Sequence, residues 1–486
     1  MRKLIWLSLI IAVLVSSMLF FADVHAATYV SGPISSDTTW SLANSPYMLT
    51  GSVFVNPGVT LTIEPGVKVD FYMHSLQVSG TLIARGTSDN NIIFFSSYPT
   101  NSMAIYFWSS TSWNESTGTG SIIENAVLSS AYISVSSCSP KISNNYFTNN
   151  RYTSISIING SSLILNNSFD CQATVIYVTS SVPCSPTISR NFVKCTSSGS
   201  PYGINVGNNN AYISDNNVTS CFWGIYVTGN STITRNLIRN STYGIFTSGS
   251  TATIEGNILS NNTFGISISG GGGTIRNNTI GNNQVGILAS TASGNISQNN
   301  IFGNTQYSLG MSTPNSVDAT YNWWGTTDIS AINQTIYDNK NSTLLGKVNF
   351  TPFLNDSNSA APALVSINYV PIPTPTPYPT PIPVPTATPT PRPTATLGPI
   401  STPTPPPADP TTPPVTPTPL PTPSPTPKIV PGSPLSLGGA TFAEIISQFD
   451  IMGLAKLVLI ALVIMWVIII LSSVDRKFGK KDNKKP

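Results

Sequence analysis

A repeat of 20 to 25 residues between residues 140 and 324 is the feature that most constrains the fold. Each copy has an isoleucine, an asparagine three residues later and an apolar side chain two residues further on, and several copies continue into Gly-Ile. The isoleucines are Ile142, Ile164, Ile188, Ile213, Ile233, Ile254, Ile275 and Ile296, and the asparagines are Asn145, Asn167, Asn191, Asn216, Asn236, Asn257, Asn278 and Asn299. Self-similarity at a short, nearly fixed period is typical of a solenoid, in which each copy packs on its neighbours.

The spacing within the repeat favours strands over helices. No copy contains the ten or more apolar-periodic residues that a helix needs, whereas short alternations such as Ser231–Thr234 are separated by polar corners. Two or three short strands with their corners use about 20 to 25 residues, and successive coils then stack about 4.8 Å apart. We therefore predict an all-β, right-handed parallel β-helix with the isoleucines in one interior column.

The asparagine column has a structural explanation. We expect these residues at corners, because asparagine tolerates the left-handed backbone conformation better than most residues do. Their stacked amides can also donate and accept hydrogen bonds from coil to coil along the solenoid axis. This column is therefore predicted to stabilise the fold and not to bind a ligand.

Residues 27–369 are predicted to form the β-helix domain. Less regular coils begin it, residues 98–121 form a looser insertion, and large aromatic side chains close it with a cap at about residues 317–356. Residues 1–26 have a basic start, an apolar run and small residues at the end, which predicts a signal peptide. An uncleaved membrane anchor is the alternative for the same segment.

The composition changes sharply after the predicted domain. In residues 371–434, 27 of 64 positions are proline, so we expect segment 370–434 to be a disordered Pro/Thr-rich stalk with a reach of up to roughly 200 Å. A Pro-rich ligand for aromatic grooves is the other interpretation. A juxtamembrane segment (435–451), a transmembrane helix (452–474) and a basic tail (475–486) follow. Because the basic residues stay on the cytoplasmic side, the pattern predicts a single-pass type I protein of the cell membrane with its β-helix outside.

The charge composition excludes one class of partner. Residues 27–369 contain 11 Lys or Arg and 13 Asp or Glu, which leaves no positive field for nucleic acid. The expected partners are therefore the membrane and glycans or other cell-surface proteins.

The Ile-x-x-Asn repeats, the motif Leu61–Gly66 and the ending Tyr321–Gly325 resemble the parallel β-helix repeat family. This family includes pectin-lyase-like proteins, copper-accessory proteins of nitrous oxide reduction and many surface proteins. The resemblance covers about residues 55–355. It implies the fold and says little about function, because the fold carries many activities.

Two sets of side chains share positions in the repeat and are candidate ligand-binding residues. Arg190, Asp215 and Arg235 fall at the same position of consecutive copies, which favours a solvated charge ladder over an anion-binding strip. A second position, just before the Gly of Gly-Ile, carries aromatic residues: Tyr202, Trp223, Tyr243 and Phe264. These rings either pack on one another or, if they face outward, form a platform for sugar rings.

Cysteines and sequons complete the candidates. Cys171 and Cys195 share a position in adjacent coils at about one strand spacing, which favours a disulfide between them, or a buried cysteine stack, over a metal site. We expect no metal and no other cofactor. Thirteen Asn-x-Ser/Thr sequons are candidate glycosylation sites: Asn114, Asn159, Asn166, Asn217, Asn230, Asn240, Asn261, Asn277, Asn295, Asn333, Asn341, Asn349 and Asn355.

No catalytic constellation is evident, since the sequence has no paired-Asp motif, and His74 is the one histidine after residue 26. The leading hypothesis is a membrane-anchored, non-enzymatic module for an envelope, adhesion or glycan-binding role. A membrane-tethered carbohydrate-active lyase, hydrolase or epimerase is the first alternative. An accessory protein of a transporter or metalloenzyme is the second.

Overall fold

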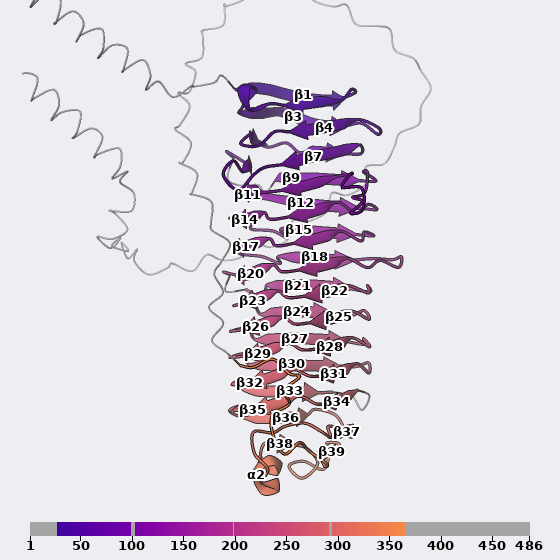
Figure 1. Ribbon diagram of the computed structural model, residues 1–486, viewed down its shortest axis with the longest axis vertical. Helices are drawn as coiled ribbons and strands as arrows, with labels where there is room; N and C mark the ends of the chain where they lie inside the picture. Colours follow the sequence, from indigo (N-terminus) through magenta and orange to yellow (C-terminus); the bar gives the residue numbers. More distant parts are fainter. Residues whose placement is uncertain (1–26, 99–102, 198, 291–293, 365–486) are drawn as a thin grey trace, which may run out of the picture. The chain divides into compact units, whose positions relative to one another are not determined.

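The computed structural model describes residues 27–98, 103–197, 199–290 and 294–364, which form a β-solenoid (Figure 1). Within these ranges two large sheets contain 12 and 25 strands, and adjacent strands in both sheets run parallel. The 12-stranded sheet is one wall of the solenoid, and the larger sheet folds around the other two. We call these walls face 1, face 2 and face 3.

Each coil contributes strands to these three faces. Face 1 consists of β2 (Thr38–Trp40), β4 (Thr60–Ile63), β7 (Thr81–Arg85), β10 (Ile122–Glu124), β13 (Lys141–Ser143), β16 (Leu163–Leu165), β19 (Thr187–Ser189), β22 (Tyr212–Ser214), β25 (Thr232–Thr234), β28 (Thr253–Glu255), β31 (Thr274–Arg276) and β34 (Asn295–Ser297). Face 2 consists of β5 (Lys68–Asp70), β8 (Ile92–Phe95), β11 (Ala126–Ser129), β14 (Tyr146–Thr148), β17 (Ser168–Cys171), β20 (Phe192–Cys195), β23 (Asn217–Thr219), β26 (Leu237–Arg239), β29 (Ile258–Ser260), β32 (Thr279–Gly281) and β35 (Asn300–Phe302). Face 3 consists of β6 (Leu76–Val78), β9 (Met103–Trp108), β12 (Ala131–Ser136), β15 (Ile155–Ile158), β18 (Ile176–Thr179), β21 (Tyr202–Gly207), β24 (Trp223–Val227), β27 (Tyr243–Ser248), β30 (Phe264–Ser269), β33 (Val285–Ala289), β36 (Tyr307–Met311) and β38 (Ile336–Tyr337).

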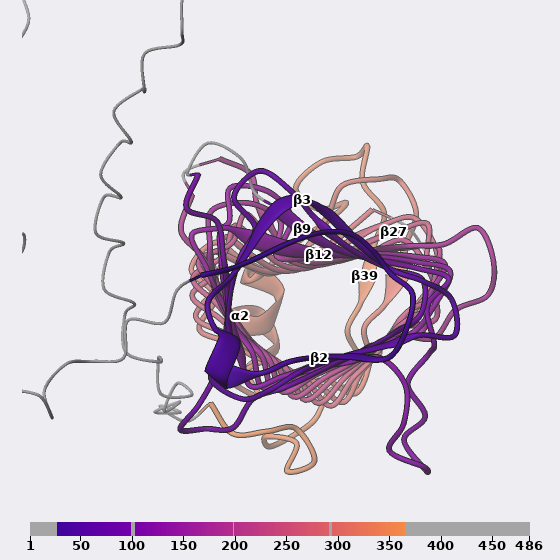
Figure 2. The same ribbon diagram turned by 90° about the horizontal axis from the view of Figure 1, so that it is seen from above.

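The solenoid is a right-handed parallel β-helix, as the repeat predicts. Seen from the N-terminal end, β2 of face 1 lies opposite β9, β12 and β27 of face 3, and the chain runs clockwise as it recedes (Figure 2). The N-terminal strands β1 (Thr28–Ile34) and β3 (Tyr47–Val55) start the larger sheet, and β3 pairs with both β5 and β6. A 3-10 turn, η1 (Leu42–Asn44), lies between β2 and β3.

The interior is built from the columns that the repeat predicts. On face 1 the isoleucines are strict register partners, so Ile142 pairs with Ile164 and Ile164 with Ile188. On face 2 the second apolar position is aligned in the same way, with Phe147 opposite Phe169 and their rings stacked at 4.6 Å. These side chains are fully buried, because alternation within each strand points them inward and the next coil covers them.

The looser insertion expected at residues 98–121 is a wrong prediction for part of that range. Residues Met103–Trp108 form the regular strand β9, which pairs with β6 on one side and β12 on the other. Its alternating pattern Ala-Ile-Tyr-Phe-Trp buries Ile105 and Phe107 and leaves Tyr106 and Trp108 on the outer surface. The loop that follows the strand does leave the coil.

The C-terminal end is closed by a small helix and aromatic side chains. Asp328 caps the N-terminus of α2 (Ile329–Gln334), because its carboxylate accepts hydrogen bonds from two backbone N–H groups of the first turn. The helix buries Ile332 completely. Strands β37 (Val317–Asp318) and β39 (Val348–Asn349) pair beside it. Trp324 is buried against Phe350, so the apolar end of the solenoid is covered.

The predicted signal peptide, stalk, transmembrane helix and basic tail lie outside the described residues, and so do residues 365–369 of the predicted β-helix domain. In the part of the chain that the structure describes, no helix has the length and apolarity needed to cross a membrane.

Candidate functional site

The asparagine column forms a continuous ladder at the turn between face 1 and face 2. Each amide nitrogen donates to the amide oxygen of the next asparagine, as in Asn167 to Asn191 (3.1 Å), and to an isoleucine carbonyl of the preceding coil (2.9 Å). Asn322 ends the ladder by accepting from Asn299 at 2.9 Å. The amides are 0–2% exposed, so the ladder stabilises the coils and cannot contact a ligand.

The expected left-handed conformation belongs to the residue before each ladder asparagine and not to the asparagine itself. The φ values at these positions are 54° to 66°, and the residues are Asn144, Asn166, Arg190, Asp215, Arg235, Gly256, Asn277, Gln298 and Tyr321. The left-handed residue turns the chain and directs its own side chain outward. The following asparagine can then point inward and bond along the axis.

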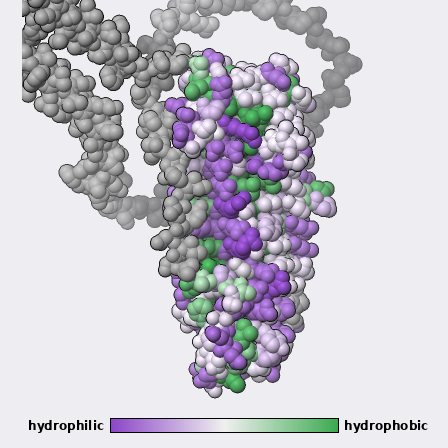
Figure 3. Space-filling view, viewed as in Figure 1, coloured by the Kyte–Doolittle hydropathy of each residue, from purple (hydrophilic) through white to green (hydrophobic). Residues whose placement is uncertain are grey.

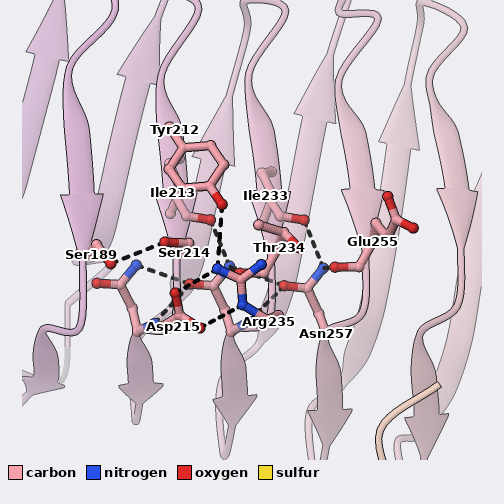
Figure 4. A network of polar contacts seen from close by, with 12 residues as sticks. Ser189, Tyr212, Ile213, Ser214, Asp215, Ile233, Thr234, Arg235, Glu255 and Asn257 are labelled. Carbon is pink, nitrogen blue, oxygen red and sulfur yellow. Dashed lines mark hydrogen bonds and ion pairs between the residues drawn. The ribbon is translucent and has the colours of Figure 1, made fainter. Parts of the chain in front are cut away.

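Arg190, Asp215 and Arg235 therefore project from the edge between face 1 and face 2. The Arg235 guanidinium holds both carboxylate oxygens of Asp215 at 2.8 Å and reaches the hydroxyl of Tyr212 at 3.3 Å (Figure 4). A guanidinium that is already bound to a carboxylate in this two-pronged manner has little capacity left for an external anion.

The protonation state of Asp215 supports the same conclusion. Burial raises the pKa of this carboxyl, but the hydrogen bonds from Arg235 and Ser214 and the charges of Arg235 and Arg190 outweigh it, so the pKa lies below its ordinary value. An ionised, paired carboxylate is a poor general acid. In the next two coils the charged pair lies one residue earlier, at the ends of β28 and β31, where Glu255 and Arg276 are 3.0 Å apart. This edge is an alternating charge ladder.

The aromatic column lies elsewhere, on the outer surface of face 3. Tyr202, Trp223, Tyr243 and Phe264 begin β21, β24, β27 and β30 and are register partners in consecutive coils. Their ring centroids are 5.9, 4.2 and 4.9 Å apart and the ring planes lie within 13° of parallel. All four side chains are half-buried, so the rings both stack on one another and face outward. We call this set the aromatic ladder.

The glycine after each ladder ring allows the coils to approach. A Cβ on Gly224 would lie 2.5 Å from the carbonyl oxygen of Gly244 and 2.8 Å from the Cγ2 methyl of Ile238. No other residue fits there without moving the backbone, which explains the recurring Gly-Ile. The close stacking of coils in turn brings the rings of Trp223 and Tyr243 into contact.

A second row of rings, not predicted from the sequence, widens this surface. Tyr226 and Phe246 stack at 5.3 Å and meet Trp223 edge-on at 5.7 and 4.7 Å. Phe222 adds a further edge-on contact to Trp223 at 5.2 Å. Tyr226 and Phe246 could have been found in the sequence, because each follows the isoleucine of Gly-Ile. This outward position is aromatic in two adjacent copies.

A polar hollow of about 510 Å³ lies beside the aromatic ladder, at the corner between face 2 and face 3. It is lined by Ser197, Gly199, Ser220, Cys221, Phe222, Asn240, Ser241, Thr242, Asn261 and Thr263. Hydroxyl and amide groups dominate the lining and no charged side chain contributes to it. Flat rings and neutral hydrogen-bonding groups are therefore adjacent on the surface.

Figure 3 shows no large apolar patch on the face of the molecule that it presents. In Figure 3 apolar side chains appear as small, separate patches on a mostly polar or neutral exterior. Among the described residues no group of three or more His, Cys, Asp and Glu side chains gathers in a way that could hold a metal ion.

The predicted disulfide between Cys171 and Cys195 is wrong. The two residues are register partners as expected, but Cys195 is bonded to Cys221, with the Cα atoms 5.0 Å apart. Cys221 sits one residue further into the corner of the next coil, so its side chain reaches Cys195. The Cys171 sulfur instead accepts from the hydroxyl of Ser154 at 3.1 Å, and burial raises the pKa of this thiol to about 12.

The sequons divide by exposure. Nine asparagines are exposed: Asn114, Asn230, Asn240, Asn261, Asn295, Asn333, Asn341, Asn349 and Asn355. Asn159, Asn166 and Asn277 are half-buried. Asn217 is 4% exposed, so its burial argues against glycosylation of this residue in the folded chain. Use of the other twelve remains a prediction.

The described residues have the fold of a parallel β-helix protein. Residues 155–342 match the family described as periplasmic copper-binding protein (NosD), a match that spans less than half of the chain. A comparison with curated proteins gave no match.

Three solved structures show a weak likeness to this chain. A double mutant of the periplasmic alginate epimerase AlgG is 12% identical (TM-score 0.26) and the match covers 68% of this chain and 77% of that one. The GH136 lacto-N-biosidase from Eubacterium ramulus is 11% identical (TM-score 0.30), with 71% and 68% covered. An alginate lyase from Paenibacillus sp. is 12% identical (TM-score 0.18), with 61% and 93% covered. At these TM-scores the likenesses say nothing about the activity of this chain.

Proposed function

We propose that this chain is a non-enzymatic surface protein that binds glycans through the aromatic ladder of face 3. The observation that carries the proposal is the row of outward, stacked rings beside a neutral polar hollow. A sugar ring has apolar C–H surfaces and a rim of hydroxyl groups. Aromatic side chains supply flat apolar contact, and the nearby amides and hydroxyls supply the hydrogen bonds that fix orientation.

The proposed setting is the outer surface of a cell membrane. Residues 1–26 would direct export, residues 27–369 would form the binding domain, and segment 370–434 would act as a stalk. Segment 435–451 would lead into a single transmembrane helix at 452–474, with the basic tail 475–486 in the cytoplasm. The support for this organisation is the sequence pattern of these segments.

A glycan array probed with the full chain in detergent tests the proposal. We expect the chain to bind a subset of glycans, and Trp223→Ala to lower affinity about two- to tenfold, because ring-stacking contacts contribute about 0.5–1.5 kcal/mol each. Tyr29→Ala is the matched control, since Tyr29 is a 66% exposed aromatic residue on β1, away from the ladder.

Two results would contradict the proposal. The first is an array without any bound glycan. The second is turnover of a polysaccharide that is lost when Asp215 is replaced by asparagine, because this would make the protein an enzyme and place the site on the charge ladder.

A further inference from the structure

A second aromatic hollow lies on face 3 near the N-terminal end. Trp108 at the end of β9 is 68% exposed and Phe54 on β3 is 41% exposed, and both line a hollow of about 500 Å³. The remaining lining residues are Val55, Asn56, Pro57, Ser75, Gln77, Ser79 and Tyr106. The hydroxyl of Tyr106 is hydrogen-bonded to that of Tyr132 at 2.6 Å, so this ring is held in place. No charged side chain lines the hollow.

This hollow and the aromatic ladder share one face of the solenoid. The outward position of Tyr106 is continued by register partners in every following coil: Ser134, Ser156, Tyr177, Asn205 and Tyr226. Tyr106 and Tyr226 are therefore five strand spacings apart, or about 24 Å. The neighbouring outward column starts at Trp108 and continues through Ser136, Ile158 and Thr179, so uncharged side chains lie along both columns between the two sites.

The charge of face 3 restricts the ligand. The face 3 strands from β6 to β36 contain no Lys, Arg, Asp or Glu. A polyuronate or sulfated glycan would bring anionic groups against rings and hydroxyls with no cation on these strands, and an unpaired charge loses more on desolvation than neutral hydroxyls do. A neutral sugar chain loses nothing of this kind and can pair its hydroxyls with Ser, Thr, Asn and Gln.

We infer that face 3 binds one uncharged polysaccharide chain, which lies along the solenoid axis and contacts both the Trp108 hollow and the aromatic ladder. The inference rests on the proposed glycan binding and adds the class of ligand, its direction and a second site. Because the two sites act on one chain, a polymer long enough to reach both should bind at least about a hundredfold more tightly than a short oligosaccharide.

Titration of the full chain with neutral polysaccharides, with short oligosaccharides of the same sugars and with polyuronates of equal length tests this inference. We expect tight, salt-insensitive binding of a neutral polymer and weak binding of the uronates. Trp108→Ala and Trp223→Ala should each reduce polymer affinity at least about tenfold and bring it toward the value for the short oligosaccharide. Tyr29→Ala should leave it unchanged, and because Trp108 and Tyr29 are almost equally exposed (68% and 66%), neither substitution removes core packing.

The outcomes separate the second site from the proposed function. If Trp223→Ala abolishes polymer binding while Trp108→Ala has no effect, the second site is refuted and the glycan-binding ladder stands. If polyuronates bind more tightly than neutral polymers and lose affinity with added salt, the ligand class is refuted. If no glycan binds the wild-type chain, the inference fails together with the proposed function.

Discussion

Replacing Asn236 by alanine removes a buried amide from the middle of the asparagine ladder. The amide oxygen of Asn236 accepts from the backbone N–H (3.0 Å) and the side-chain amide (2.9 Å) of Asn216. Its amide nitrogen donates to the carbonyl of Ile213 (2.9 Å) and to Asn257 (3.0 Å). Alanine therefore deprives two donors of Asn216 and the carbonyl of Ile213 of these partners. At about 1–3 kcal/mol for each buried group left unpaired, the loss for these three groups should be about 3–9 kcal/mol.

Two measurements would check this magnitude. Denaturant unfolding reports the overall loss, and hydrogen exchange locates it, because a solenoid opens by coils and need not unfold as one unit. Protection of amides in the coil of Asn236 and its two neighbours should fall most. Asn333→Ala is the matched control, since Asn333 is exposed on α2. Equal behaviour of the two variants would refute the argument that the ladder holds the coils together.

The pH dependence of Asn236→Asp gives a sharper test of the same amide. A carboxylate at this position can still accept from Asn216, but it cannot donate to the carbonyl of Ile213 and faces the amide oxygen of Asn257. Burial and these oxygens should raise the pKa of the new carboxyl above its unfolded value of about 3.9. The variant should therefore gain stability as pH falls through the raised folded pKa, and a flat or opposite dependence would contradict this.

Three other substitutions test the Arg235–Asp215 ion pair, the Cys195–Cys221 disulfide and the contacts of residues 355–364. Arg235→Ala should cost less than about 1 kcal/mol, because the Arg235 and Asp215 side chains are 55% and 35% exposed. Since the folded pKa of Asp215 is lowered, this contribution should be present above about pH 3.9 and disappear as pH falls through the folded pKa, as measured by denaturation across pH. Cys221→Ser should lower stability by about 3 kcal/mol, because the disulfide closes a sequence separation of 26 residues, and reduction of the wild-type chain should reproduce the loss. Asn358→Ala removes side-chain hydrogen bonds of 2.9 and 2.6 Å to two coils, so hydrogen exchange should increase in residues 355–364 and stay unchanged in the N-terminal coils.

The repeat was sufficient to predict the architecture. Strand alternation and the period of 20 to 25 residues specify which side chains point inward, and burial of Ile142 and Phe147 follows from that pattern alone. The amide ladder could be predicted for the same reason, because residues at one position of a solenoid repeat are forced to stack. The rings of Trp223 and Tyr243 stack at 4.2 Å by the same rule.

Contacts between side chains at different positions of the repeat could not be predicted from the period of the sequence. The disulfide joins Cys195 to Cys221, which lie one residue out of register, and the actual path of the corner brings them together. The left-handed conformation falls on the residue before each ladder asparagine, because the asparagine must point inward to bond along the axis. Sequence spacing alone does not distinguish these neighbouring corner positions.

For the candidate binding surface, too, the sequence predicts some features and only the folded structure defines others. The interior follows from the sequence because every coil must bury the same positions, and that requirement imposes a period. Outward side chains carry no such requirement, so the hollow at Trp108 and Phe54 has no periodic signal and forms where strands β3, β6 and β9 come together. Likewise, Tyr226 and Phe246 join Trp223 in one surface because the coils stack in close register, a relation between chain segments that becomes defined when the solenoid folds.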